Sequence, residues 1–461
     1  MSIGILLWLL ITLNAAMIFW GFIGGPRIYR YSVFSAAVFA GFAIPQLIGL
    51  SNDSGIGWRR YLPEGALDLT VMMSILCLLF LWIGDMMGGR GPGNMRIVPL
   101  TEYNPARLLQ FGFALMILGN TIYQVAISSM TKEDFDSLGS QWTGSITIVI
   151  FFVTMSKYGF AIMTYMYFRT KSPAALICVI AGLAMNAIAF VTGARRADAA
   201  HTFFVLVLGL FFARKVVLPA WFLGILFVVG TLWANGVGQL RGGSEQQTFL
   251  EKLENADLLA NFNQILSDGG PELTNCAMHI WCIDNHPEGV LGGLDFGLVH
   301  WKHLVHAYFP GQIFGYDLKF SIQPTLHDWP KELLSYEGPP GATYTGMADA
   351  FESFWWMGWI KFYIVGYIMG RWYNRAVRGD LWSQIAYLAL MSPALHTITH
   401  HTTWLLINYI HMMIFAWPGM AWARLRLTGD HRPSVQGQPQ KFPVNVRSSV
   451  IPPSLRRPLG P

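Results

Sequence analysis

The segment ALDLTVMMSILCLLFLWIGDMM (66–87) decides the fold class, because it is a run of mostly apolar side chains long enough to cross a bilayer. A membrane-spanning helix needs about 20 such residues. Comparable runs recur along the chain and predict eleven spans, so we expect an all-α polytopic membrane protein. The predicted spans cover approximately residues 3–24, 32–50, 66–87, 107–128, 143–168, 173–191, 198–213, 217–236, 350–370, 381–396 and 403–424.

The composition of the whole chain fits this class. Of its 461 residues, 53% are hydrophobic and only 12% are charged, whereas a soluble globular chain carries about 25% charged residues. Eighteen Trp, 17 Tyr and 31 Phe add aromatic side chains of the kind that gather at membrane–water interfaces. These values exclude a soluble multidomain enzyme, a disordered protein and a disulfide scaffold. The net charge of +5 needs no nucleic-acid partner, since cationic cytoplasmic loops are usual in membrane proteins.

Lysines and arginines are divided unequally between the two alternating sets of short loops. One set holds twelve cations and the other holds five. Because short cytoplasmic loops carry the excess of positive charge, we predict that the first set is cytoplasmic and the N-terminus lies outside. The twelve are Arg27, Arg30, Arg90, Arg96, Arg107, Arg169, Lys171, Arg214, Lys215, Arg371, Arg375 and Arg378, and the five are Arg59, Arg60, Lys132, Arg195 and Arg196.

This pattern predicts four regions along the chain. Residues 1–236 form a bundle of about eight helices, and 350–425 add about three more. Between them, 237–349 form one large periplasmic loop. Residues 426–461 are rich in Pro, Gly, Ser and Arg without an apolar period, which predicts a disordered cytoplasmic tail.

Two stretches of the large loop are expected to be helical. Residues 248–266 have apolar side chains at helical spacing, and 294–308 place Leu298, Trp301 and Val305 on one stripe. The histidines of the second stretch fall on its other side. Such a helix fits a position on the membrane surface or across the end of the bundle.

Ten of the twelve histidines lie in segments predicted to be outside or near the outer end of a span. This distribution favours polar chemistry at the outer leaflet, although the longest loop of a membrane protein also tends to hold its polar residues. The ten are His201, His279, His286, His300, His303, His306, His327, His396, His400 and His401.

Cysteines and histidines also raise a metal hypothesis. Cys276, His279, Cys282 and His286 could supply four zinc ligands on an irregular segment. Their spacing matches none of the usual zinc signatures, so we predict no metal. A disulfide between Cys276 and Cys282 is a second reading if the segment is extracytoplasmic.

Three arginines are the sharpest functional signal. Arg195 and Arg196 lie in the short turn TGARRADAA (192–200), on the side where cations are scarce, and Arg241 follows the eighth span in QLRGG. Ionisable residues at membrane depth are functional candidates by default, and the planar guanidinium suits phosphate and pyrophosphate. The alternative is an arginine that reaches lipid headgroups or pairs with Asp198.

Acidic residues open the ninth span. In YEGPPGATYTGMADAFESFWWMGWIKFYIVGYIMG (336–370), a helix is expected to begin near Thr345 with Asp349 and Glu352 on its first turns. A carboxylate there can simply stabilise the helix N-terminus, or it can act as a general base. Lys157 and Lys361 lie within predicted spans and need partners, for which Glu352 is one candidate.

At these residues the chain resembles the Wzy-type O-antigen (oligosaccharide repeat-unit) polymerases, which are related to O-antigen ligases and the GT-C membrane glycosyltransferases. The resemblance lies in the glycine–arginine turn at 192–200, in Arg241 opening a large outer loop, and in Glu352 before a glycine-spaced helix. It covers the topology of most of the chain. The chain departs from the family in lacking a second long outer loop.

The resemblance implies a cofactor-independent transferase at the outer face of the bacterial inner membrane. It would move glycan from one polyprenyl pyrophosphate to a sugar hydroxyl of another lipid-linked repeat unit. Arg195, Arg196 and Arg241 would bind the pyrophosphate, Glu352 or His327 would take the acceptor proton, and aromatic side chains such as Tyr344 would stack on sugars. Membrane lipids are expected partners, and the resemblance allows for a chain-length regulator protein.

Three other functions stay open. An O-antigen ligase would use the same donor with a different acceptor. Another GT-C transferase would usually carry an acidic pair in its first outer loop, where Asp53 and Glu64 are eleven residues apart. A transporter would need ionisable residues at mid-membrane and paired halves, which the 8-plus-3 layout lacks.

Overall fold

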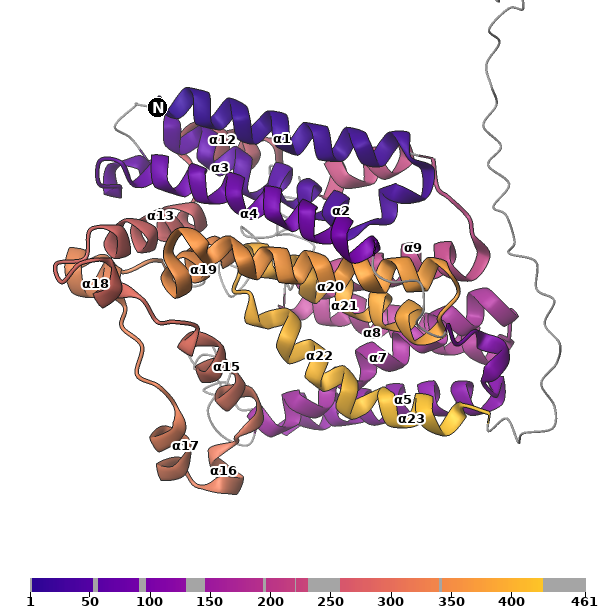
Figure 1. The fold of residues 1–461 in the computed structure, drawn as a ribbon. Coiled ribbons are helices and arrows are strands. Elements are labelled where there is room, and N and C mark those ends of the chain that lie inside the picture. Colours follow the sequence, from indigo (N-terminus) through magenta and orange to yellow (C-terminus); the bar gives the residue numbers. More distant parts are fainter. Residues whose placement is uncertain are drawn as a thin grey trace, which may run out of the picture. The chain divides into compact units, whose positions relative to one another are not determined.

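The computed structural model describes residues 2–52, 57–90, 97–129, 146–193, 196–219, 221–230, 258–339 and 342–425. Within these residues the regular elements are helices, and the single β-bridge joins Tyr103 to Arg424. The described residues up to Arg424 belong to one compact unit (Figure 1).

A bundle of helices makes up most of this unit. A π-helical turn at Phe39–Ala43 joins α2 (Tyr31–Val38) to α3 (Ile44–Ser51). The long helices are α1 (Ile3–Ile23), α2 (Tyr31–Val38), α3 (Ile44–Ser51), α4 (Ala66–Gly89), α5 (Pro105–Ser129), α7 (Ile146–Thr170), α8 (Pro173–Gly193), α9 (Arg196–Arg214), Trp221–Gly230, α20 (Trp359–Val377), α21 (Leu381–Thr399), α22 (Thr403–Phe415) and α23 (Trp417–Ala423).

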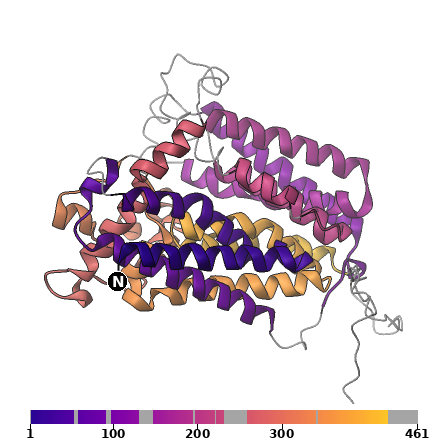
Figure 2. The same ribbon diagram turned by 90° about the horizontal axis from the view of Figure 1, so that it is seen from above.

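Shorter helices lie in the segment between the helix Trp221–Gly230 and α20. Figures 1 and 2 show most of them gathered toward one end of the long helices. They are α12 (Leu258–Asp268), α13 (Pro271–Asp284), α14 (Val290–Gly293), α15 (Leu298–Tyr308), α16 (Gly311–Phe314), α17 (Tyr316–Ile322), α18 (Trp329–Leu334) and α19 (Gly346–Phe354), with 3₁₀ turns at Gly25–Tyr29, Gly57–Tyr61, Leu100–Glu102 and Trp355–Gly358.

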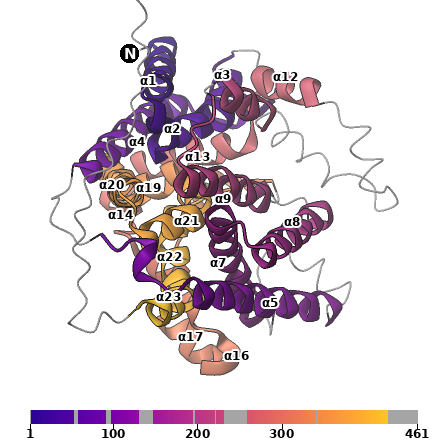
Figure 3. The same ribbon diagram turned by 90° about the vertical axis from the view of Figure 1, so that its right-hand side faces the viewer.

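Among the described residues, five helices are long and apolar enough to cross a membrane, which indicates a multi-pass membrane protein. They are Ile3–Ile23, Tyr31–Ser51, Ala66–Gly89, Pro105–Val125 and Ala197–Arg214. The other predicted spans fall on helices outside this set of five, so the total of eleven stays a prediction. Figure 3 looks along the long helices and places α21 in their midst, consistent with the burial of most of its residues.

Glycines bring α4 and α20 into close contact. A Cβ atom on Gly366 would lie 2.3 Å from the carbonyl oxygen of Leu81, and Gly84, Gly88 and Gly370 meet the facing backbone as closely. Small residues allow such approach between membrane helices. The register of these contacts makes the two helices parallel, so both begin at one end of the bundle. We call this the loop end, because the short helices pack there.

A buried ion pair joins the helices at the opposite end. Arg30 Nε lies 2.8 Å from Asp85 Oδ2, which also accepts a hydrogen bond of 2.6 Å from the Ser32 hydroxyl. The Arg30 guanidinium lies over the rings of Trp20 and Tyr373, at 5.9 and 5.2 Å. α1, α2, α4 and α20 are thereby tied together away from the loop end.

The described part of the predicted large loop belongs to the same compact unit as the bundle. α12 covers the end of the helix predicted over 248–266, whose first ten residues lie outside the described residues. The predicted tail, 426–461, also lies outside them.

The expectation for the ninth span was wrong in detail. The predicted span 350–370 is broken at Trp355, whose φ of 50° and ψ of −135° are not helical, so α19 is a separate short helix before α20. On α15, Leu298 and Trp301 are about half exposed, while His300 and His303 face the start of α22. The threonines that begin α22 can hydrogen-bond histidine, so the polar stripe packs inward.

Candidate functional site

The candidate site lies at the loop end and is built around α19. Thr345, the residue before the first turn of this helix, accepts a hydrogen bond of 3.4 Å from the Ala348 amide through its side-chain hydroxyl. A Cβ atom on Gly346 would lie 1.7 Å from the Thr397 carbonyl oxygen, so only glycine fits against α21 there. The helix is buried from Gly346 to Ser353. It therefore holds two acidic side chains inside the protein.

The first acidic side chain, Asp349, is fully buried and ion-paired. Lys361 Nζ lies 3.0 Å from Asp349 Oδ1 and donates a further hydrogen bond of 2.6 Å to the Ser353 hydroxyl. Asp349 Oδ2 accepts from the Thr402 amide at 2.8 Å and from the Thr402 hydroxyl. Burial favours the neutral acid, but the charge of Lys361 and these hydrogen bonds outweigh it and hold the pKa of Asp349 well below its usual range. Asp349 is therefore an ionised carboxylate held in place by its contacts.

Three histidines surround the Thr402–Thr403 pair. The His300 ring nitrogens lie 3.2 Å from each of the two threonine hydroxyls, and His303 Nδ1 lies 3.3 Å from Thr403 Oγ1. The His303 ring stacks on that of His401 with centroids 3.9 Å apart. Burial lowers the pKa of His303 to about 4 and lowers those of His300 and His401 as well. These imidazoles are neutral at pH 7.

The polar groups continue across the bundle to α9. Lys157 on α7 forms an ion pair of 2.8 Å with Asp198 on the first turn of α9. The His396 and His400 rings lie 5.2 Å apart. We call the whole set the polar belt: Lys157, Asp198, His201, His300, His303, Asp349, Lys361, His396, His400, His401, Thr402 and Thr403. It connects α19 to the beginning of α9.

Glu352, the second acidic side chain of α19, has a different environment. It is only 6% exposed, and among the described residues no hydrogen bond reaches its carboxyl group. Its backbone carbonyl accepts a hydrogen bond of 3.1 Å from the amide of Asp295, which begins the turn into α15. Burial raises the pKa of Glu352 to about 8, and the charge of Asp295 acts in the same direction. Two carboxyl groups three residues apart are thus driven toward opposite protonation states.

The other predicted site residues are found in different places. The side chain of His327 is 55% exposed, lies 3.1 Å from Glu332 and stacks on Trp329, so it is apart from the polar belt. Tyr344 precedes α19, and its ring meets that of His279 with centroids 4.4 Å apart. The buried Tyr344 hydroxyl has no hydrogen-bond partner within the described part of the chain.

The three predicted arginines are placed only in part. Arg195 and Arg241 lie outside the described residues. Arg196 is the first residue of α9, two positions before Asp198. Its helix therefore begins beside one end of the polar belt.

Asp349 emerges as a central residue that the sequence analysis left with only general roles. Glu352 was a candidate partner for both lysines, and this was wrong: Lys361 pairs with Asp349 and Lys157 with Asp198. The Lys361–Asp349 contact spans the break at Trp355 that separates α19 from α20. The polar run HHTT (400–403) between two apolar spans was the available signal for the histidine end of the belt.

The cysteines do not form the predicted alternatives. Cys276 and Cys282 are free and buried, and both lie on α13. Six residues of helix separate their Cα atoms by about 9 Å, beyond disulfide reach. Among the described residues, no three His, Cys, Asp or Glu side chains are grouped as metal ligands.

Comparison with protein-family models, curated proteins and solved structures found no match to this chain.

Proposed function

We propose that this chain is a membrane glycosyltransferase that polymerises lipid-linked oligosaccharide repeat units at the outer face of a bacterial inner membrane. The observation that carries the proposal is the carboxyl pair of α19. Asp349 is held ionised by Lys361, whereas Glu352 has a pKa raised to about 8. Two titratable groups with pKa values driven apart are the usual arrangement for acid–base chemistry.

In the proposed reaction, ionised Glu352 takes the proton of a sugar hydroxyl on the acceptor unit. The hydroxyl oxygen bonds to the anomeric carbon of the donor glycan. The bond from that carbon to the pyrophosphate oxygen breaks, and its electron pair leaves with the lipid pyrophosphate. Glu352 then returns its proton to solvent. Asp349 keeps its charge throughout and positions Lys361 and Thr402.

The leaving pyrophosphate would bind at the other end of the polar belt. α9 begins at Arg196, and a helix N-terminus favours anions through its free amide groups and its dipole. Arg195, Arg196 and Arg241 would add guanidinium groups that form bidentate contacts with phosphate oxygens. Apolar surfaces of the helices, such as Ile177 and Ile180 on α8, would face lipid tails.

A transfer assay tests this proposal. The full chain in nanodiscs is incubated with lipid-linked repeat units extracted from the source organism, and product length is read by gel electrophoresis. We expect Glu352→Gln to lower the rate by roughly 10²- to 10⁴-fold, the usual contribution of a general base. Glu288→Gln, at an exposed glutamate of the same segment, is the control and should leave the rate unchanged. A normal rate in Glu352→Gln would exclude Glu352 as the base.

A further inference from the structure

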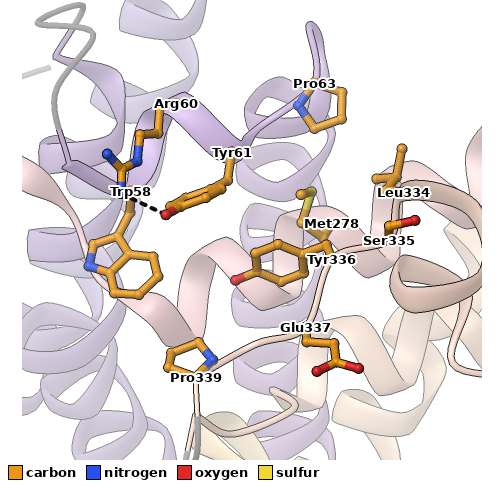
Figure 4. Close-up of a pocket in the computed structure, with 10 residues that line it drawn as sticks. All are labelled: Trp58, Arg60, Tyr61, Pro63, Met278, Leu334, Ser335, Tyr336, Glu337 and Pro339. Atoms are coloured by element: carbon orange, nitrogen blue, oxygen red, sulfur yellow. Dashed lines mark hydrogen bonds between the residues drawn. The ribbon is translucent and has the colours of Figure 1, made fainter.

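A pocket with aromatic walls lies at the loop end, apart from the polar belt (Figure 4). Its volume is about 600 Å³, within the range of roughly 300–1,000 Å³ that ligand sites occupy. The 3₁₀ turn Gly57–Tyr61 supplies Trp58 and Tyr61, α13 supplies Met278, and the chain after α18 supplies Tyr336. The pocket is therefore built from three separate segments.

The aromatic side chains form a connected wall. The rings of Trp58 and Tyr61 have centroids 5.8 Å apart, and those of Tyr61 and Tyr336 are 6.0 Å apart. Arg60 donates a hydrogen bond of 2.6 Å to the Tyr61 hydroxyl, and its guanidinium lies over the same ring. Figure 4 shows the three rings side by side along the pocket.

Polar side chains also line the pocket. The Tyr336 hydroxyl is buried and has no hydrogen-bond partner among the described residues. Arg60 and Glu337 bring one positive and one negative charge to the lining, where Arg60 bonds to the Tyr61 hydroxyl and Glu337 pairs with Lys331 at 2.6 Å. A buried hydroxyl without a partner is costly, and a ligand hydroxyl would satisfy it.

We propose that this pocket is a carbohydrate-binding subsite that holds pyranose rings of a neutral oligosaccharide. A pyranose ring presents C–H faces that pack on aromatic rings and hydroxyl groups that bond to Tyr336, Arg60 and Glu337. A lipid tail would leave the buried Tyr336 hydroxyl without a partner, and one positive and one negative charge in the lining favour a neutral ligand over a strongly anionic one.

The subsite deepens the proposed function, on which it rests for its biological role. α13 packs against α19 and also lines the pocket, so the pocket is at the same end of the bundle as Glu352. A glycan bound there is held beside the proposed transfer site and not within it.

Binding of sugars without lipid tests the subsite separately from transfer. The full chain in nanodiscs is titrated with isomaltotetraose, cellotetraose, chitotetraose and the repeat-unit oligosaccharide released from its lipid, followed by saturation-transfer NMR. We expect at least one probe to bind saturably. Trp58→Ala and Tyr336→Ala should weaken it by about three- to tenfold, as loss of an aromatic contact implies. Tyr336→Phe keeps the ring and should weaken it less, and Tyr316→Ala, an exposed tyrosine on α17, should not change it.

The outcomes separate the two proposals. Saturable binding that Trp58→Ala and Tyr336→Ala leave unchanged, in variants with wild-type melting temperature, would overturn the subsite. So would no binding by a preparation that still transfers glycan, or displacement of the probe by glycerophosphoglycerol, which would assign the pocket to lipid headgroups. Binding that depends on these residues in a chain without transferase activity would keep the subsite and overturn the proposed function.

Discussion

Asp349 and Lys361 show how a single contact holds the candidate site. Both side chains are buried, so each charge depends on the other and on the Ser353 and Thr402 hydroxyls for its stability. Breaking such a pair leaves an uncompensated charge inside the protein, which costs about 3–5 kcal/mol. The pair therefore positions α19 as well as tuning its chemistry.

We expect Lys361→Met and Asp349→Asn each to lower the melting temperature of the purified protein, and the double variant to recover part of the loss. Lys331→Met is the matched control, because Lys331 and Glu337 form a solvent-exposed pair, and such pairs contribute little to stability. Differential scanning fluorimetry in detergent would measure all four. Equal shifts for Lys361→Met and Lys331→Met would contradict a buried, structural pair.

The raised pKa of Glu352 predicts the pH dependence of transfer. A general base must be deprotonated, and Glu352 is mostly protonated below its pKa of about 8. The rate should therefore rise with pH and level off above about 8, and Glu352→Gln should remove this rise along with most of the activity. His327→Gln should keep the profile, since that side chain is exposed and pairs with Glu332. A profile that stays flat from pH 6 to 9 in the wild-type chain would argue against Glu352.

At the scale of elements, the close parallel contact between α4 and α20 places the first turns of both helices at the loop end. Gly366→Ala would place a Cβ atom 2.3 Å from the Leu81 carbonyl, so the helices must move apart. Overpacking of this kind costs about 1–3 kcal/mol and should lower both thermal stability and transfer activity. Gly224→Ala is the control, because nothing lies within 4 Å of its Cβ position. Wild-type stability of the Gly366→Ala variant would contradict this close contact between α4 and α20.

Apolar length predicted the helices well but could not predict how they break or turn. The helix over 66–87 is α4 almost to the residue, since 20 apolar side chains leave few alternatives. The break at Trp355 is accompanied by the hydrogen bond from Lys361 to Asp349, a contact between residues twelve apart that no periodicity encodes. The inward face of α15 likewise depends on Thr402 and Thr403, about 100 residues away.

At the scale of the whole molecule, the predicted spans alternate in direction, so the third and the ninth run the same way whichever end of the bundle lies outside. α4 and α20 pack in parallel, which agrees with this alternation. The site is proposed on the outer face, so accessibility tests it directly. The native cysteines, Cys77, Cys178, Cys276 and Cys282, are all buried and should not react.

Cysteine labelling in intact cells can therefore use single added cysteines. Leu291→Cys, at a side chain 73% exposed on α14, should react with a membrane-impermeant maleimide. Lys171→Cys, in the turn between α7 and α8, should react only after permeabilisation. The reverse pattern would overturn the predicted orientation and place the polar belt on the cytoplasmic side.

The function proposed for this chain is to join lipid-linked repeat units. The most direct measurement is the length distribution of lipid-linked and surface glycans in a strain that lacks the chain and carries a plasmid for the wild type or for Glu352→Gln. We predict that the deletion strain still transfers single repeat units but makes no long chains, that the wild type restores them, and that Glu352→Gln does not. An unchanged glycan distribution in the deletion strain, or loss of all transferred glycan including single units, would contradict the account.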